Sequence, residues 1–356
     1  MNIEQIKEAL SYLRTARIPG TERVGIPAMI WGPPGLGKSE GVAQFAASIE
    51  ADLVDERMST TESVDWRGMA RDTEHGVQWS RPDTFTRLWH AHENGRPSIL
   101  FLDEANVGVT PSLFAIMLQL TLDERVGPHK LPPTTYTCAA GNRPGESQGA
   151  QPLPEANGNR LAHLHAEFHL DTWASWALDA GVDPRVLAFA KFREALLSGA
   201  AKDESATAPQ RGVQRREHKT AFLTPRSLTR LSPILQAPAP LIPSLAASII
   251  GDAESAEFCA FVGAWRQFPT YAQIIADPTG ASIPDESNAS IMFALATMLQ
   301  KRVDRATIGA AFAYLRRLPR DWQSFIVVSA TRRESSLKET RAVIDWLIDN
   351  QEVALA

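Results

Sequence analysis

The chain has 356 residues, 44% of them hydrophobic and 22% charged, and its 36 Lys and Arg against 41 Asp and Glu give a net charge of −5. A chain of that length is too long to form one compact core and suits about two domains. The charge balance excludes an overall basic field, so nucleic-acid binding would need a local groove or a partner. Because the sequence has neither a signal-peptide pattern nor an apolar stretch of bilayer length, we expect a cytoplasmic protein without a membrane segment.

The first 170 residues alternate between helix and strand patterns. Helical spacing of apolar residues marks residues 2–16, the segment that begins near residue 37, and residues 111–122. Short apolar runs typical of strands lie at 26–31, from Leu53 onward, and at 99–102, 135–140 and 164–168. The uninterrupted run at 99–102 suits a strand covered on both faces, as in a parallel sheet. We therefore predict an α/β domain over residues 1–170, built on a parallel five-stranded sheet.

The rest of the chain has almost entirely helical patterns. Residues 199–220 contain little apolar content, which predicts an exposed loop within a helical connection at 171–235. Residues 236–356 return to helical spacing, interrupted by Pro-rich turns, and predict an all-α C-terminal region.

Two insertions in the first domain carry turn signals. Glu74–Gly76 lies between the strand-like residues Ala70 and Trp79, which predicts a β-hairpin. Gly127–Pro128 marks a second turn and predicts a second hairpin. The alternative for each segment is an ordinary surface loop.

Residues 32–39 read GPPGLGKS and match the phosphate-binding pattern GxxxxGK[ST], directly after a predicted strand and at the start of a predicted helix. Glycines let backbone N–H groups turn towards anionic oxygens, and the helix start adds its positive end. Lys38 would hold the β- and γ-phosphates, and the Ser39 hydroxyl would bind Mg²⁺. The predicted site for ATP and Mg²⁺ consists of Gly32, Pro33, Pro34, Gly35, Leu36, Gly37, Lys38 and Ser39. The alternative is a Gly-Pro turn with an incidental lysine.

Two acidic residues, Asp103 and Glu104, directly follow the buried strand run at 99–102. The carboxyl end of a strand in a parallel sheet faces the ligand crevice. Asp103 would therefore hold the Mg²⁺, and Glu104 would accept a proton from the attacking water. The alternative is a solvated turn at the end of a strand.

Three motifs make the chain resemble the AAA+ ATPases, and within them the MoxR-like group, over roughly residues 20–235. These motifs are GPPGLGKS at Gly32–Ser39, ILFLDEAN at Ile99–Asn106 and AAGNRP at Ala139–Pro144. The resemblance implies that Asn142 is the residue called sensor 1, which aligns the attacking water by hydrogen bonding. The two predicted hairpins are similar to insertions of the same group.

A fourth motif, NGNRLAHL at Asn157–Leu164, places Arg160 where the family carries its arginine finger. Such a guanidinium reaches the γ-phosphate bound by a neighbouring subunit and stabilises the charge that develops there. Arg143 and Arg125 are competing candidates nearby, and the alternative is that Arg160 is an ordinary surface residue.

A fifth motif, LTPRSL at Leu223–Leu228, resembles the family's sensor 2. Thr224 suits a helix N-cap and Pro225 suits the first helical position. Arg226 would then lie in the first turn of a lid helix and point at the nucleotide. The alternative is an arginine at a helix start with no ligand.

The resemblance implies a ring of identical subunits, most often a hexamer, because an arginine finger acts only across a subunit boundary. It further implies chaperone-like remodelling of a protein partner, often one with a von Willebrand factor A-type domain. The segment 171–235 would begin the lid, and 236–356 would form the helical lid region. The loop at 199–220 and the last 100 or so residues match no motif of the family.

Two other functional classes stay open at this point. One is a nucleic-acid-associated AAA+ NTPase, such as a helicase loader or a restriction-system NTPase, whose turnover DNA would stimulate in a salt-dependent way. The other is a small-molecule kinase or a nucleotide-binding switch, which would need no arginine from a neighbouring subunit.

Overall fold

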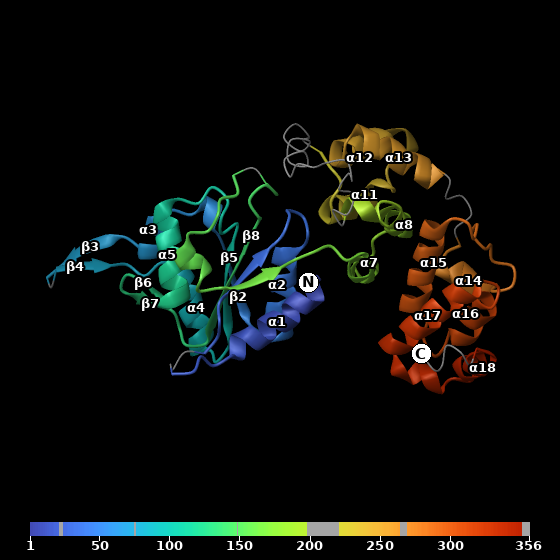
Figure 1. Ribbon diagram of the computed structural model, residues 1–356, viewed down its shortest axis with the longest axis horizontal. Helices are drawn as coiled ribbons and strands as arrows, with labels where there is room; N and C mark the ends of the chain where they lie inside the picture. Colours follow the sequence, from blue (N-terminus) through green and yellow to red (C-terminus); the bar gives the residue numbers. More distant parts are fainter. Residues whose placement is uncertain (21–23, 75, 148, 198–220, 264–268, 351–356) are drawn as a thin grey trace. The chain divides into compact units, whose positions relative to one another are not determined.

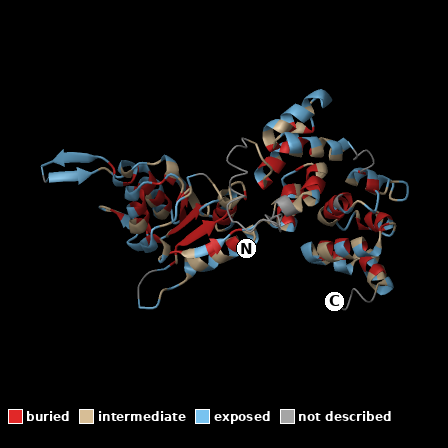
Figure 2. Ribbon diagram, turned by 45° about the horizontal axis from the view of Figure 1, so that its top comes forward, coloured by how far each residue is buried: buried red, intermediate tan, exposed pale blue. Residues whose placement is uncertain are grey.

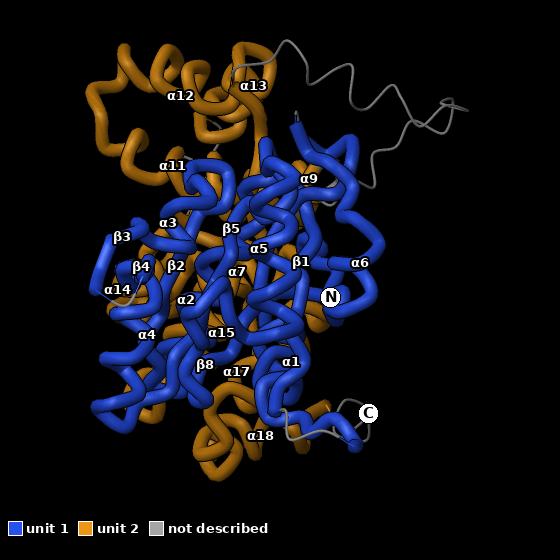
Figure 3. The backbone as a smooth tube through the Cα atoms, turned by 90° about the vertical axis from the view of Figure 1, so that its left-hand side faces the viewer, with its two compact units in different colours: residues 1–168, 203–218 blue, residues 169–202, 219–356 orange. Residues whose placement is uncertain are grey.

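The computed structural model describes residues 1–20, 24–74, 76–147, 149–197, 221–263 and 269–350. The described residues divide into two compact units (Figure 3): residues 1–168 form one, and residues 169–197 with 221–350 form the other. Each unit has its own hydrophobic core. The predicted loop at 199–220 lies outside the described residues.

The first unit is built on a five-stranded sheet in the order β2-β5-β8-β1-β9, and all neighbouring strands run parallel (Figure 1). The strands are β1 (Ala28–Trp31), β2 (Asp52–Arg57), β5 (Ser98–Asp103), β8 (Thr135–Gly141) and β9 (Ala162–His165). Every residue of β1 and β5 is buried, as expected for strands covered on both faces. The predicted α/β fold with a parallel five-stranded sheet is confirmed, and the carboxyl ends of its strands meet at one edge.

The fifth strand differs from its predicted position at 164–168. β9 begins two residues earlier, at Ala162, whose N–H donates to the Pro27 carbonyl at 2.8 Å. It is an edge strand, and its side chains alternate between buried Leu164 and exposed neighbours such as His163. A strand with one polar face has no continuous apolar run, so the sequence pattern placed it late.

Helices cover both faces of this sheet, and the buried strands lie between them (Figure 2). They are α1 (Ile3–Thr15), α2 (Lys38–Ser48), α3 (Ser63–Arg67), α4 (Asp83–Glu93), α5 (Pro111–Leu122) and α6 (Glu155–Gly158), with a 3₁₀ turn η1 at Met58–Thr60. On one face Leu10 of α1 and Phe45 of α2 belong to the same core cluster as Phe101. On the other face Leu88 of α4 and Met117 of α5 cluster with strand residues including Leu102. The helices predicted at 2–16 and 111–122 are confirmed.

Both predicted hairpins are present in the first unit. β3 (Ala70–Thr73) and β4 (Gly76–Trp79) form an antiparallel pair that is exposed along its length and projects away from the sheet (Figures 1 and 2). Gly68, at its base, has φ +79°, and a Cβ there would lie 1.9 Å from the carbonyl oxygen of Ser80. The second hairpin pairs β6 (Arg125–Val126) with β7 (His129–Lys130).

The described part of the second unit is helical, as predicted. Its helices are α7 (Leu170–Asp179), α8 (Pro184–Phe192), α9 (Glu194–Leu197), α11 (Pro225–Ile234), α12 (Ile242–Ile250), α13 (Asp252–Gly263), α14 (Tyr271–Ala276), α15 (Ala289–Arg302), α16 (Ile308–Leu315), α17 (Arg320–Arg333) and α18 (Arg341–Asp349). Helices α14 to α18 share a core that includes the buried side chains of Tyr314 and Trp346. Within the described residues, no helix combines the length and apolarity that crossing a bilayer requires.

Candidate nucleotide-binding site

The predicted phosphate loop connects β1 to α2 at the carboxyl edge of the sheet. Gly35 and Gly37 have φ angles of +80° and +94°, which L side chains rarely adopt. A Cβ on Gly32 would lie 3.1–3.2 Å from atoms of Ala166 and Leu36, so this residue also has little space for a side chain. Gly37 is the N-cap of α2, and as a glycine it has no side chain that could cap the helix. The positive N-terminal end of α2 therefore begins directly at the phosphate loop, where an anion would be stabilised.

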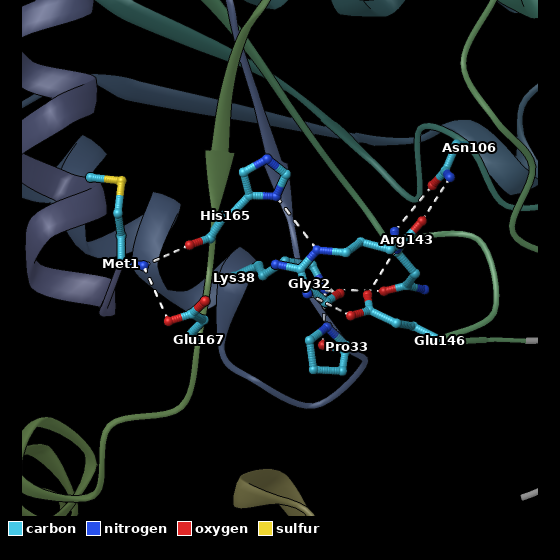
Figure 4. Close-up of polar contacts among 10 residues, drawn as sticks. Met1, Gly32, Pro33, Lys38, Asn106, Arg143, Glu146, His165 and Glu167 are labelled. Carbon is cyan, nitrogen blue, oxygen red and sulfur yellow. Dashed lines mark hydrogen bonds and ion pairs between the residues drawn. The ribbon is translucent and has the colours of Figure 1, made fainter. Parts of the chain in front are cut away.

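Lys38 is the first residue of α2, and its ammonium group lies across the loop (Figure 4). Its Nζ donates to the carbonyl oxygens of Gly32 at 2.6 Å and Pro33 at 3.0 Å, and to Oδ1 of Asn142 at 3.1 Å. The charge is therefore held at the mouth of the phosphate loop by neutral acceptors. A phosphate oxygen, which is anionic, would compete well for these donors.

Ser39 and Asp103 meet as the sequence predicts for two ligands of one cation. Ser39 Oγ, on α2, donates to Oδ2 of Asp103, the last residue of β5, at 2.8 Å. Partial desolvation and then the nearby Asp103 carboxylate raise the pKa of the Asp55 carboxyl on β2. A cation between Ser39 and Asp103 would offset this repulsion. One hydroxyl and one carboxylate oxygen fit Mg²⁺, which commonly takes one or two protein oxygens and completes its octahedron with water and phosphate.

Glu104 occupies a strained position directly after β5. Its φ is +51°, a left-handed conformation that costs a residue with a side chain roughly 1–3 kcal/mol. Its carboxylate accepts a hydrogen bond from the Ser59 hydroxyl, and its Oε1 lies 3.6 Å from Nε of Arg57. Both partners come from the end of β2 and from η1. The strained backbone thus turns this carboxylate towards the neighbouring strand end, next to Asp103.

Asn142 directly follows β8, and its side chain contacts the phosphate-loop lysine. Besides accepting from Lys38, it donates through Nδ2 to Oγ of Ser147 at 3.0 Å. The structure therefore brings together Lys38, Ser39, Asp103 and Asn142, which the sequence analysis assigned to one site.

Asn106 is a site residue to which the sequence analysis gave no role. It is fully buried, and its Nδ2 donates to the carbonyl oxygens of Asn142 at 2.8 Å and Gln151 at 2.7 Å. Its Oδ1 accepts from the Asn142 N–H at 3.1 Å. This one amide clamps the backbone on both sides of Asn142 and joins the segment after β5 to the segment after β8. A Cβ on Gly141 would lie 2.3 Å from the same Oδ1, so the close approach depends on glycine.

Arg160 lies in the turn between α6 and β9, near the sheet edge strand. The side chain is partly exposed, and its guanidinium donates to the Ala156 carbonyl within the same turn. The competing candidate Arg143 forms an ion pair with Glu146 at 2.6 Å (Figure 4). Arg125, the other competitor, donates to the carbonyl of Gly127 within its own hairpin. Arg143 is therefore charge-compensated within its own subunit, whereas the guanidinium of Arg160 contacts a backbone carbonyl.

Arg226 belongs to the second unit and lies in the first turn of α11. Thr224 is the N-cap, its Oγ1 accepts from the Ser227 N–H at 3.0 Å, and Pro225 is the first helical residue, as predicted. The Arg226 side chain is exposed. Its contact with nucleotide stays a prediction.

No protein-family model matches the chain, and no curated relative matches it. Among solved structures, a protein from Cytophaga hutchinsonii provisionally described as an ATPase is similar at 20% identity, with a TM-score of 0.33 over 46% of this chain and 46% of that one. A point mutant of RuvB from Thermotoga maritima is similar at 15% identity, with a TM-score of 0.41 over 74% of this chain and 71% of that one. The aligned region thus spans just under half of the Cytophaga protein. The roles assigned to this chain therefore depend on its own residues and their geometry.

Proposed function

We propose that this chain binds ATP with Mg²⁺ and hydrolyses it to ADP and phosphate, as an AAA+ ATPase of the MoxR-like group. One observation supports this most strongly: Lys38 contacts Asn142, and Ser39 contacts Asp103, at the carboxyl edge of a parallel sheet. Phosphate-loop enzymes need these chemical groups at one place, namely a cation for the phosphates, two metal ligands and a polar group near the attacking water.

The phosphate loop would hold the triphosphate before any chemistry occurs. Backbone N–H groups of the loop and of the first turn of α2 would bind the phosphate oxygens, and Lys38 would exchange its carbonyl partners for the β- and γ-phosphates. Ser39 and Asp103 would hold Mg²⁺, which supplies positive charge to the β- and γ-phosphate oxygens. These contacts orient the γ-phosphate towards the segment after β5.

Glu104 would act as the general base. As the water oxygen forms its bond to the γ-phosphorus and the bond to the β-phosphate oxygen breaks, the carboxylate takes a proton from that water. Asn142, clamped by Asn106, would hold the water in line through its side-chain amide. The Ser59 hydroxyl occupies one Glu104 oxygen, so that oxygen must exchange partners before it can take the proton.

Arg160 would complete the site of the neighbouring subunit, which makes a ring, most simply a hexamer, the functional assembly. Its partial exposure and its single guanidinium contact to a backbone carbonyl support this role, because such a contact is readily exchanged for a phosphate. Arg226 would contact the nucleotide from the lid, which the helices beyond residue 170 would form. Hydrolysis would then drive remodelling of a protein partner, such as one with a von Willebrand factor A-type domain.

Glu104→Gln tests the chemical step separately from binding. The amide cannot take the proton, so we expect ATP affinity within about two-fold of wild type and a turnover at least 100-fold lower. Release of inorganic phosphate measures turnover, and titration with a fluorescent ATP analogue in the presence of Mg²⁺ measures binding. Normal turnover in this variant would remove Glu104 as the base.

The same assay separates the proposed function from its rivals. A kinase would transfer phosphate to an acceptor and release little inorganic phosphate in its absence. A nucleic-acid motor would be stimulated by DNA, with stimulation that decreases as salt rises. We expect phosphate release without an acceptor and without a requirement for DNA.

A further inference from the structure

A hydrogen-bonded chain of side chains leads away from the phosphate loop on the side opposite Asp103. Trp31, the last residue of β1, directly precedes Gly32 and is 8% exposed. Its indole Nε1 donates to Nδ1 of His163 on β9 at 2.8 Å, and the two ring planes lie within 15° of each other. An indole nitrogen only donates, so Nδ1 of His163 carries no proton.

The other nitrogen of this imidazole is then the donor. Nε2 of His163 lies 2.9 Å from the carbonyl oxygen of Gly158, the last residue of α6. With Nδ1 unprotonated, a neutral ring carries its proton on Nε2 and donates it to that carbonyl. His163 therefore accepts from the end of the phosphate-loop strand and donates to a residue that lies two positions before Arg160.

Backbone hydrogen bonds also hold the turn that carries Arg160, including one from the Asn159 N–H to the Glu155 carbonyl at 3.0 Å. The bonds that Arg160 and Leu161 donate are longer. The Arg160 N–H reaches the Asn157 carbonyl at 3.3 Å, and the Leu161 N–H reaches the Gly158 carbonyl at 3.3 Å. Asn157 is anchored through Nδ2 to the Phe114 carbonyl of α5 at 2.9 Å, which fixes the front of the turn. The His163 contact with the Gly158 carbonyl is a second anchor of this turn, and through His163 it connects the turn to the buried Trp31.

We infer that His163 is a positioning residue, which ties the phosphate-loop strand to the turn of Arg160 and so holds that guanidinium where the neighbour's γ-phosphate can be reached. The inference rests on the proposed action of Arg160 across a subunit boundary. The inference has a distinctive consequence. A substitution of His163 in one subunit should slow hydrolysis in the neighbouring subunit, whose site receives Arg160 from the substituted one.

Two substitutions distinguish the contribution of the His163 hydrogen bonds from that of its ring packing. His163→Phe keeps an aromatic ring beside Trp31 and removes both bonds, whereas His163→Gln offers an amide oxygen as acceptor and an amide N–H as donor. We expect His163→Phe to lower kcat about 10-fold, within the roughly 100-fold that a 1 Å misplacement can cost. His163→Gln should restore most of this loss, and ATP affinity should stay unchanged in both variants.

Mixed rings test the direction of the effect. Lys38→Ala subunits provide an arginine but no working site, and Arg160→Ala subunits provide a site but no arginine, so mixing them should restore phosphate release. Adding His163→Phe to the Lys38→Ala subunit should lower the restored activity about 10-fold. Adding it to the Arg160→Ala subunit should leave the restored activity unchanged, because that subunit donates no arginine.

The outcomes separate the two hypotheses. No recovery in the basic mixture, in rings shown to exchange subunits, would overturn the action of Arg160 across the boundary. Recovery that is insensitive to His163→Phe, or equally sensitive in both placements, would overturn the positioning role alone. Should His163→Phe fail to fold, as judged by its thermal unfolding midpoint, Trp31→Phe in the Lys38→Ala subunit removes the donor at the other end and must give the same directional loss.

Discussion

The carboxyl edge of the sheet and the interiors of helices α15 and α17 use their buried polar groups differently, although the helical unit also has long-range contacts, such as Trp346 Nε1 donating to Oε1 of Gln323 at 3.0 Å. In the sheet unit, Asn106 contacts backbone carbonyls 36 and 45 residues away, and Ser39 contacts a carboxylate 64 residues away. In the helical unit, the buried hydroxyls of Thr297 and Thr331 each donate to the carbonyl four residues earlier in their own helix. The first pattern fixes distant loops against each other, whereas the second satisfies a hydroxyl locally and positions nothing else. Long-range polar contacts at one sheet edge therefore indicate a site, and local ones indicate helix packing.

The largest expected effect is on nucleotide binding, through Lys38→Ala. The ammonium group is the cation that the phosphate loop directs at the phosphates, and its loss removes charge-assisted hydrogen bonds. We expect ATP affinity to fall on the order of 100-fold, measured by calorimetric titration with Mg²⁺. Lys301, which pairs with Asp179 at 2.7 Å in the helical unit, is the matched control. Lys301→Ala should leave the affinity within about two-fold of wild type, since its ammonium group pairs with a carboxylate of the helical unit and is no part of the phosphate loop.

If Lys38→Ala and Lys301→Ala had the same effect on ATP affinity, the contrast between the sheet edge and the helical unit would be wrong. The phosphate loop would then be a structural turn in which the Lys38 ammonium group binds protein acceptors such as the Gly32 carbonyl. A loss of affinity confined to Lys38→Ala would instead support the sheet edge as the nucleotide site.

The next effect concerns stability, through Asn106→Ala. This change removes the buried side chain that bonds the N–H and carbonyl of half-buried Asn142 and the carbonyl of exposed Gln151. Since a lost partner costs about 1–3 kcal/mol where water does not replace it, we expect the free energy of unfolding to fall by roughly 1–3 kcal/mol. The control Thr331→Val replaces a locally bonded hydroxyl with a methyl group and should cost less than about 1 kcal/mol. Urea denaturation followed by tryptophan fluorescence compares the two variants, and equal losses would contradict the distinction.

The two kinds of contact also explain what the sequence could predict. The phosphate loop and the acidic pair are local patterns, in which residue type and spacing within eight residues predict the chemistry. The parallel sheet was predictable because β5 is buried on both faces and its apolar run is continuous. Edge strand β9 was placed two residues late because half of its side chains are exposed. The alternating segment AHLH of β9 carries a period-two signal, but it is only four residues long and has no continuous apolar run.

The clamp at Asn106 and the link from Trp31 to His163 could not be predicted in the same way. Their partners are 36 to 132 residues apart, and each contact exists only because the strand order brings β5, β8, β1 and β9 together. Asn142 was assigned through a family resemblance, and its contact with Lys38 is a finding of the structure. The sequence signal for Asn106 is its position two residues after Glu104, within the motif ILFLDEAN, and its burial is a finding of the structure.

The smallest expected effect comes from adding one methyl group at the sheet edge, in Gly141→Ala. The new Cβ would lie 2.3 Å from Asn106 Oδ1 and 2.5 Å from Cε of Met29, so the clamp must shift. We expect a loss of about 1–3 kcal/mol in the free energy of unfolding, together with slower phosphate release as Asn142 moves.

Gly309→Ala in α16 is the matched control, because nothing lies within 4 Å of its Cβ position and alanine favours a helix. That variant should be neutral or stabilised by up to about 1 kcal/mol, with phosphate release unchanged. If Gly141→Ala changed stability and phosphate release as little as Gly309→Ala, then the contact between Asn106 and Asn142 could shift without loss. The position of Asn142 set by Asn106 would then not be what aligns the attacking water.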